Sequence, residues 1–123
     1  MEQGFGKLEK LKSTRLIDQL FAEGNTIKKY PIRLVYIPIS SPKDTHFKTG
    51  FSVSKRNFKT AVSRNRVKRL LRESFRKNKY IVLSSTDKTY AFMFIYLSRE
   101  ILSQQEIERC MISLLKQFSS TIR

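Results

Sequence analysis

The sequence predicts a small domain of the α+β or α/β class, with helices packed on a β-sheet in two layers. Patterned segments follow one another in the order helix, strand, strand, helix, strand, helix. Helices and sheets of this kind bury their apolar sides by packing on each other. The length of 123 residues and a hydrophobic content of 40% suit one core. We therefore expect a single domain over residues 1–123, with frayed ends at 1–6 and 120–123.

Three segments carry residues at the spacing of one helix face. The first, residues 13–23, ends before Gly24, a residue type that often terminates a helix. The second, residues 62–79, has the strongest helical pattern, and the third covers residues 103–119. The faces consist, in chain order, of Leu16, Ile17, Leu20 and Phe21; of Val67, Leu70, Leu71, Ser74 and Phe75; and of Ile107, Met111, Leu114, Leu115 and Phe118.

Three further segments have the pattern of strands. Residues 32–39 and 48–54 alternate between two faces, and Pro42 predicts a loop at 40–46 between them. Residues 90–97 form a continuous apolar run after a turn at 86–89, which is typical of a central strand buried on both faces. The strand–helix–strand unit over residues 51–97 indicates two parallel strands joined through the second helix.

The chain has the features of a cytoplasmic protein. Its N-terminal segment lacks the apolar stretch of a secretory signal, and its longest apolar run, residues 90–97, is far shorter than the roughly 20 residues of a membrane helix. Cys110 is the single cysteine, so no disulfide can form within the chain. We expect a cytoplasmic location, with no membrane and no obligate protein partner.

Most of the net charge of +15 is concentrated in one segment. Residues 55–79 contain eleven lysines or arginines and one acidic residue, Glu73. On the predicted helix, one basic stripe faces away from the apolar side. It consists of Arg64, Lys68, Arg72 and Arg76 at four-residue intervals, with Asn65 and Arg69 beside them. Like charges at this spacing repel each other, whereas a phosphate backbone attracts them. We therefore expect nucleic-acid binding; the alternative is a merely solvated helix face.

The residue types of an independent nuclease are missing. The ten acidic residues are scattered along the chain, whereas metal-dependent phosphodiester cleavage needs clustered carboxylates. His46 is the single histidine, which excludes a histidine acid–base pair. Cys110 beside the apolar Met111 suits a core thiol better than a nucleophile. No zinc-binding spacing and no phosphate-binding glycine loop occurs. We therefore expect no catalytic and no metal-binding residue in this chain.

The basic segment resembles the signature of the bacterial ribonuclease P protein family. The matching string is residues 61–76, AVSRNRVKRLLRESFR, which contains Arg64-Asn65-Arg66. The preceding residues 50–56, GFSVSKR, are similar to the family's strand that leads into this helix. The N-terminal Phe5-Gly6-Lys7 and Lys10-Leu11-Lys12 also fit. The resemblance extends over nearly the whole chain.

The resemblance implies both a fold and a function. The fold is a small α/β sandwich with about four strands and three helices, and with a left-handed strand–helix–strand crossover around the basic helix, against the usual right-handed rule. In this family a catalytic RNA subunit performs the Mg²⁺-dependent cleavage that removes the 5′ leader of precursor tRNA. The protein binds that RNA and holds the leader. We therefore expect the catalytic RNA and precursor tRNA as partners, and Mg²⁺ only in the assembled ribonucleoprotein.

The alternative is a ribosomal-type or other structural protein that binds RNA or DNA without a role in cleavage. Such a protein could use the same basic helix to follow a groove or a backbone. A helix–turn–helix DNA reader would need a second helix close by in the sequence. The predicted strands on both sides of residues 62–79 disfavour that arrangement.

The resemblance also assigns residues. RNA binding falls to Ser52, Lys55, Arg56, Lys59, Arg64, Asn65, Arg66, Lys68, Arg69, Arg72 and Arg76. A cleft for the leader would be lined by Ile17, Phe21, Arg33 and Val35. Many relatives carry an aromatic residue in place of Ile17, and an aromatic ring is the better stacking partner for a base. Apolar periodicity alone marks burial, so Ile17 and Phe21 can equally be core residues.

Overall fold

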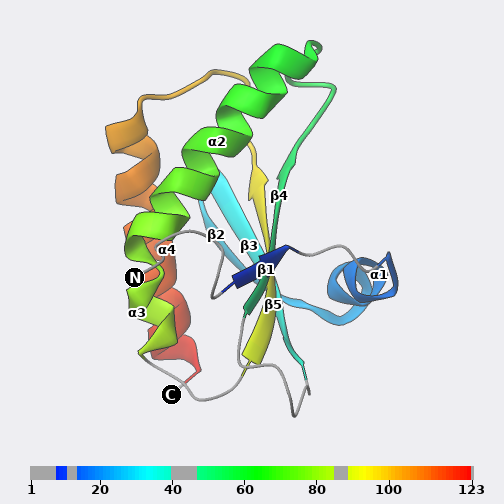
Figure 1. Ribbon diagram of the computed structural model, residues 1–123, viewed down its shortest axis with the longest axis vertical. Coiled ribbons are helices and arrows are strands. Elements are labelled where there is room, and N and C mark those ends of the chain that lie inside the picture. The colour runs from blue at the N-terminus through cyan, green and yellow to red at the C-terminus, as the bar shows by residue number, and fades with distance from the viewer. Residues whose placement is uncertain (1–7, 11–13, 40–46, 85–88, 123) are drawn as a thin grey trace.

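The computed structural model describes residues 8–10, 14–39, 47–84 and 89–122 (Figure 1). The elements in these residues are, in chain order, β1 (Leu8–Lys10), α1 (Thr14–Glu23), β2 (Asn25–Lys29), β3 (Ile32–Ile39), β4 (Phe47–Val53), α2 (Ala61–Asn78), α3 (Tyr80–Leu83), β5 (Thr89–Tyr96) and α4 (Gln104–Thr121). The predicted loop at 40–46 and most of the predicted turn at 86–89 lie outside the described residues, as do the N-terminal residues 1–6. α4 continues two residues into the end predicted to be frayed.

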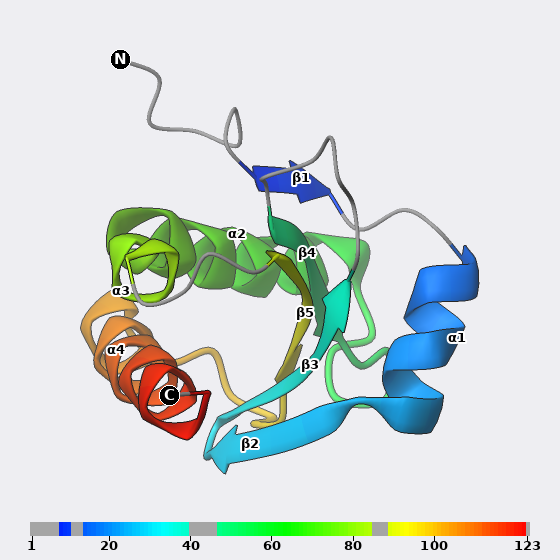
Figure 2. The same ribbon diagram turned by 90° about the horizontal axis from the view of Figure 1, so that it is seen from below.

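The strands form one five-stranded sheet in the order β1-β4-β5-β3-β2. β3 pairs antiparallel with β2 and β5, and β4 pairs parallel with β1 and β5. The predicted parallel pair on either side of the basic helix is thus confirmed. Seen from below in Figure 2, the chain leaves β4, passes through α2 to the left of the sheet and enters β5 beneath β4. This path makes the crossover left-handed.

One face of the sheet carries the main core, beneath α2, α3 and α4 (Figures 1 and 2). Leu71 and Phe75 of α2 pack there with Phe92 and Phe94 of β5, and all four side chains are fully buried. The ring centroids of Phe75 and Phe94 are 5.1 Å apart. α2 is therefore anchored on the centre of the sheet by aromatic contacts.

The opposite face of the sheet is covered by α1 alone among the described helices (Figure 2). Leu20 of α1 is buried against Val35 of β3 and Met93 of β5. Gly24 ends the helix, and its N–H donates to the carbonyl of Leu20 at 2.8 Å. A Cβ atom at Gly24 would lie 2.7 Å from Val35 Cγ1 and 2.3 Å from the oxygen of Leu20. Gly24 therefore does more than end α1, because it lets this end of the helix approach β3 closely.

The sequence pattern missed three short elements, β1, β2 and α3. β2 buries Ile27 alone, between polar residues that are exposed on both sides. β1 has three residues and α3 has four, which is too few to set a periodicity. The described residues thus hold five strands and four helices, where about four and three were expected, and the α+β class is confirmed.

Two phenylalanine side chains that differ widely in exposed fraction allow a direct test of the core. Phe75 is 0% and Phe21 is 57% exposed. We expect Phe75→Ala to lower the free energy of unfolding by about 3–5 kcal/mol, because it removes a ring packed among other buried rings. Phe21→Ala should cost about 0.5 kcal/mol or less, because its ring is already largely in solvent. Urea titrations followed by circular dichroism measure both. Equal losses would make Phe21 a core residue.

Candidate nucleic-acid interface

The helix α2 is capped at its N-terminus, and its orientation about its own axis is set by its buried face and by a hydrogen bond to α4 near its C-terminus. At the N-terminus, Thr60 Oγ1 accepts a hydrogen bond from the N–H of Ser63 at 3.1 Å. Near the C-terminus, Asn78 Nδ2 donates to the carbonyl of Ser74 at 2.8 Å and to Glu108 Oε2 of α4 at 3.2 Å. Between these ends Val67, Leu71 and Phe75 are buried. Side chains on the remaining flank of α2 therefore face solvent.

The residues predicted to bind RNA lie at the surface in two adjacent segments, which we call the basic surface. Its loop part consists of Lys55, Arg56 and Lys59, between β4 and α2, all exposed. Its helix part consists of Arg64, Asn65, Arg66, Lys68, Arg69, Arg72 and Arg76, which are exposed or partly exposed. Ser52 is separate from them. It pairs with Ile95 in the register of β4 and β5, and it alternates with the core residues Phe51 and Val53.

Three of the four cations of the basic stripe also contact the protein. Nη1 of Arg64 donates to the carbonyls of Phe58 at 2.8 Å and Lys59 at 3.1 Å. The guanidinium of Arg72 lies over the ring of Phe51, with Cζ 5.7 Å from the centroid. Arg76 forms an ion pair with Glu73 one turn earlier.

These contacts leave the positive charge of the stripe largely in place. Carbonyl oxygens and an aromatic ring attract a guanidinium but do not neutralise it. Glu73 does carry an opposite charge, and its hydrogen bond from Arg76 lowers the pKa of the Glu73 carboxyl. Three arginines of the stripe are thus held by contacts with the protein, which their spacing in the sequence does not reveal. The stripe remains a surface of strong positive potential.

The four residues predicted to line a leader cleft lie in different environments. Val35 is buried in the cluster around Leu20, and Ile17 is half-buried against the same cluster. Phe21 is exposed and Arg33 is half-buried. A ligand on this side of the sheet could therefore reach Phe21 and Arg33, whereas Val35 offers it little surface.

The register of the sheet adds neighbours to Arg33. Arg33 of β3 pairs with Ile95 of β5, and Ile95 pairs with Ser52 of β4. All three side chains are partly exposed. A cation, an apolar side chain and a hydroxyl are thus aligned across three strands on the face that carries α1. The sequence did not single out Ile95, because an uninterrupted apolar run does not reveal which face each side chain occupies.

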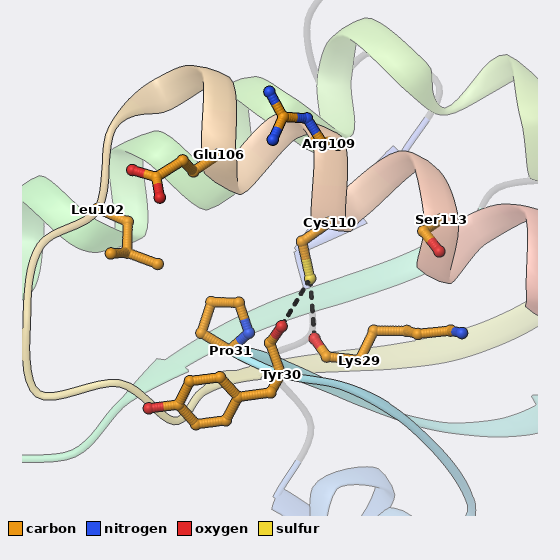
Figure 3. A pocket seen from close by; sticks show the side chains of 8 residues that line it. All are labelled: Lys29, Tyr30, Pro31, Leu102, Glu106, Arg109, Cys110 and Ser113. Carbon is orange, nitrogen blue, oxygen red and sulfur yellow. Dashed lines mark hydrogen bonds between the residues drawn. The ribbon is translucent and has the colours of Figure 1, made fainter.

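A cavity of about 530 Å³ lies apart from the basic surface, between α4 and the turn from β2 to β3 (Figure 3). Tyr30, Arg109 and Cys110 are among its lining residues. Cys110 Sγ lies 2.8 Å from the carbonyl oxygen of Lys29 and 3.8 Å from that of Tyr30. The thiol thus donates to the backbone, and its burial raises the pKa of Cys110. This environment fits a structural thiol, as the sequence indicated.

The described residues contain no group of three or more His, Cys, Asp or Glu side chains that could hold a metal ion. No helix in this part of the chain combines the length and the apolarity that crossing a membrane requires.

Comparison with known proteins gives a consistent result. The family model described as Ribonuclease P matches residues 5–119. A ribonuclease P protein component from Porphyromonas gingivalis is 36% identical over 111 residues, which cover 88% of this chain and 81% of the relative. One from Caldanaerobacter subterraneus is 43% identical over 70 residues, or 57% of each chain.

Solved structures show the same fold. The RNase P protein of Staphylococcus aureus is similar with a TM-score of 0.73 at 21% identity, covering 91% of this chain and 96% of the other. The RNase P protein of Thermotoga maritima has a TM-score of 0.72 at 22% identity, with 89% and 96% covered.

The environment of Cys110 predicts a pH-dependent difference in reactivity. We expect native protein to react with iodoacetamide more slowly than protein unfolded in urea, and with a higher pH midpoint, because burial raises the pKa of the Cys110 thiol in the folded protein. Because the thiol pKa is higher in the folded protein than in the unfolded chain, the protonated thiol contributes its full share of stability below the unfolded pKa of about 8.5. This contribution is lost as pH rises through the folded pKa. Cys110→Ala should remove that part of the pH dependence of unfolding. Equal midpoints in native and unfolded protein would contradict the burial argument.

Proposed function

The chain belongs to the ribonuclease P protein family, and on that premise we propose how it divides its two faces between two RNA partners. It is the protein subunit of the ribonucleoprotein endonuclease that acts in 5′ maturation of tRNA, and the RNA subunit carries out the chemistry. The basic surface is proposed to bind the RNA subunit. The face that carries α1 is proposed to bind the 5′ leader of precursor tRNA. A ribosomal-type or other structural RNA- or DNA-binding role is not favoured by the family match.

The observation that carries the first assignment is the fixed orientation of α2. Its buried face holds Val67, Leu71 and Phe75 against the sheet, so its cations cannot turn inward. Within residues 55–79 Glu73 is the single acid, and it is already paired with Arg76. Mutual repulsion in this surface is relieved when phosphates bind and release their counterions. The RNA subunit supplies such phosphates.

The second assignment depends on the accessible residues of the other face. The exposed ring of Phe21 can stack on an unpaired base. Arg33 can contact a phosphate, and the Ser52 hydroxyl can accept or donate a hydrogen bond to the sugar or phosphate. None of these contacts requires a particular base. We therefore propose that this face binds a single-stranded leader mainly through its backbone and through stacking.

We propose that Mg²⁺ is held by the assembled ribonucleoprotein and not by this chain. Magnesium prefers carboxylate, phosphate and water oxygens, and the described residues offer no acidic cluster. The basic surface would also repel a divalent cation. A cytoplasmic location is proposed as well, since the single cysteine is a free thiol that suits a reducing compartment.

The salt dependence of binding tests the basic surface. Affinity for the RNA subunit should fall with salt at a log–log slope of about −4 or steeper, as expected for at least five phosphate contacts. Arg69→Ala should make the slope shallower by about 0.7–0.9, because one phosphate contact is lost. Arg109→Ala is the matched control, since Arg109 is also exposed on a helix but lies on α4. Filter binding between 50 and 200 mM salt, about the range over which such slopes are taken, measures both. Equal slopes for the two variants would show that α2 does not contact the phosphates of the RNA subunit.

Discrimination between substrates tests the leader face. Phe21→Ala should leave melting temperature and assembly with the RNA subunit nearly unchanged. Its preference for precursor tRNA over leaderless tRNA should fall by about tenfold, because stacking of one base contributes ~1–3 kcal/mol. Tyr80→Ala is the control, as Tyr80 is 63% exposed and lies on α3. Competition binding with the reconstituted complex is the measurement. A leader preference that Phe21→Ala leaves intact would assign the leader to another surface.

A further inference from the structure

We propose that Arg64 is a positioning residue, which holds the loop between β4 and α2 in the shape that presents Lys55, Arg56 and Lys59 to RNA. The inference rests on the proposed function of the basic surface and divides that surface into two kinds of arginine. Arg64 acts through the loop. Arg66 and Arg69, exposed on the same helix, are free to contact phosphates themselves.

The loop has a defined local structure at its start. The N–H of Arg56 donates to Ser54 Oγ at 3.0 Å, and the N–H of Phe58 donates to the carbonyl of Ser54 at 3.1 Å. These bonds close a turn over residues 54–58. Two of the three loop cations, Lys55 and Arg56, are carried on that turn.

The middle of the loop is anchored in the core. Phe58 is 7% exposed and its ring packs beside that of Tyr96, with centroids 6.0 Å apart. The hydroxyl of Tyr96 in turn donates to the carbonyl of Glu100 at 2.6 Å. The apolar side of Phe58 therefore holds one point of the loop, while its neighbours Asn57 and Lys59 remain at the surface.

Arg64 connects this anchored point to the helix. Both acceptors of its Nη1 atom, the carbonyls of Phe58 and Lys59, belong to consecutive residues. The backbone N–H of Arg64 also donates to the carbonyl of Thr60 at 3.1 Å. One residue of α2 thus bonds three successive carbonyls of the chain that enters it. This arrangement sets the direction of both peptide groups beside Lys59.

The charge on the loop explains why such a brace is needed. Lys55, Arg56 and Lys59 are exposed, and none of them pairs with an acidic residue in the described ranges. Three like charges within five residues repel one another and favour an extended, variable loop. Binding RNA would then include the entropy loss of ordering it. With Arg64 in place the loop is ordered before RNA arrives, and its three cations are presented together.

A charge-preserving substitution separates this role from direct phosphate binding. Arg64→Lys keeps the positive charge, but the shorter reach of lysine and its compact ammonium do not reproduce a guanidinium at that point. A lysine still binds phosphate well. Arg69→Lys is the matched control on the exposed flank. Each substitution is made in the full chain and again in a chain with Lys55→Ala, Arg56→Ala and Lys59→Ala together. Affinity for the RNA subunit is measured for all of them.

The expected result is coupling between Arg64 and the loop. Arg64→Lys should weaken binding by about tenfold in the native loop and by less than about twofold in the triple-alanine loop, as expected for residues that act as one unit. Arg69→Lys should change binding by less than about twofold in both, because a lysine keeps the charge that neutralises a phosphate. Amide hydrogen exchange of free protein should become faster over residues 54–60 in Arg64→Lys and stay unchanged over α4.

Two outcomes would overturn the proposal without touching the proposed function. Equal weakening by Arg64→Lys in both loops would make Arg64 a direct RNA contact. Unchanged binding and unchanged exchange in Arg64→Lys would show that the loop needs no brace. A failure of the proposed function looks different: both the triple-alanine chain and Arg69→Ala would then bind the RNA subunit like the native chain, and the premise of this inference would be lost with it.

Discussion

The packing of α2 on the aromatic centre of the sheet is the constraint on which the rest of this structure depends. Leu71 and Phe75 are fully buried against rings of β5, and turning them out would lose several kcal/mol each. Because the helix cannot rotate, the side chains on its other flank must face solvent. Most of those side chains are arginines and lysines. The apolar packing of α2 on β5 thus determines which surface of the protein carries the positive charge.

The same sheet separates this charge from a second surface. Side chains alternate between the faces of a strand, so Phe51 and Val53 of β4 support α2 while Ser52 between them points toward the face of α1. Strand pairing then aligns Ser52 with Ile95 and Arg33. The two surfaces that we propose to bind RNA therefore lie on opposite faces of one sheet. On this proposal, a protein of this size contacts the RNA subunit and the substrate at once because each takes a different side of the sheet.

Within the basic surface, cations differ in how they are held. Arg64 is bonded to two loop carbonyls, Arg72 lies on Phe51, and Arg76 is paired with Glu73. Each of these contacts restricts a long side chain that would otherwise sample many rotamers. Restricting the side chains before binding lowers the entropy lost when RNA docks. A single helix thus carries both arginines that contact the protein and exposed arginines such as Arg69.

The sequence by itself determined the long elements and the chemistry they carry. The helical period over residues 62–79, the apolar run at 90–97 and the basic stripe are local patterns, and they predicted α2, β5 and the cations of α2 to within a residue or two. The central motif of the family resemblance lies in the same helix. Tertiary structure alone decided which face each residue of β5 occupies, that Val35 is buried while Phe21 is exposed, and that Arg64 bonds the loop. β1, β2 and α3 belong here too. The physical reasons are two. The face that each residue of β5 occupies, the burial of Val35 and the placement of β1 and α3 depend on strands and helices distant in the sequence, so no local pattern records those contacts. The bonds of Arg64 and the hairpin of β2 with β3 join residues close in the sequence, but they depend on side-chain and backbone geometry that the apolar periodicity does not encode.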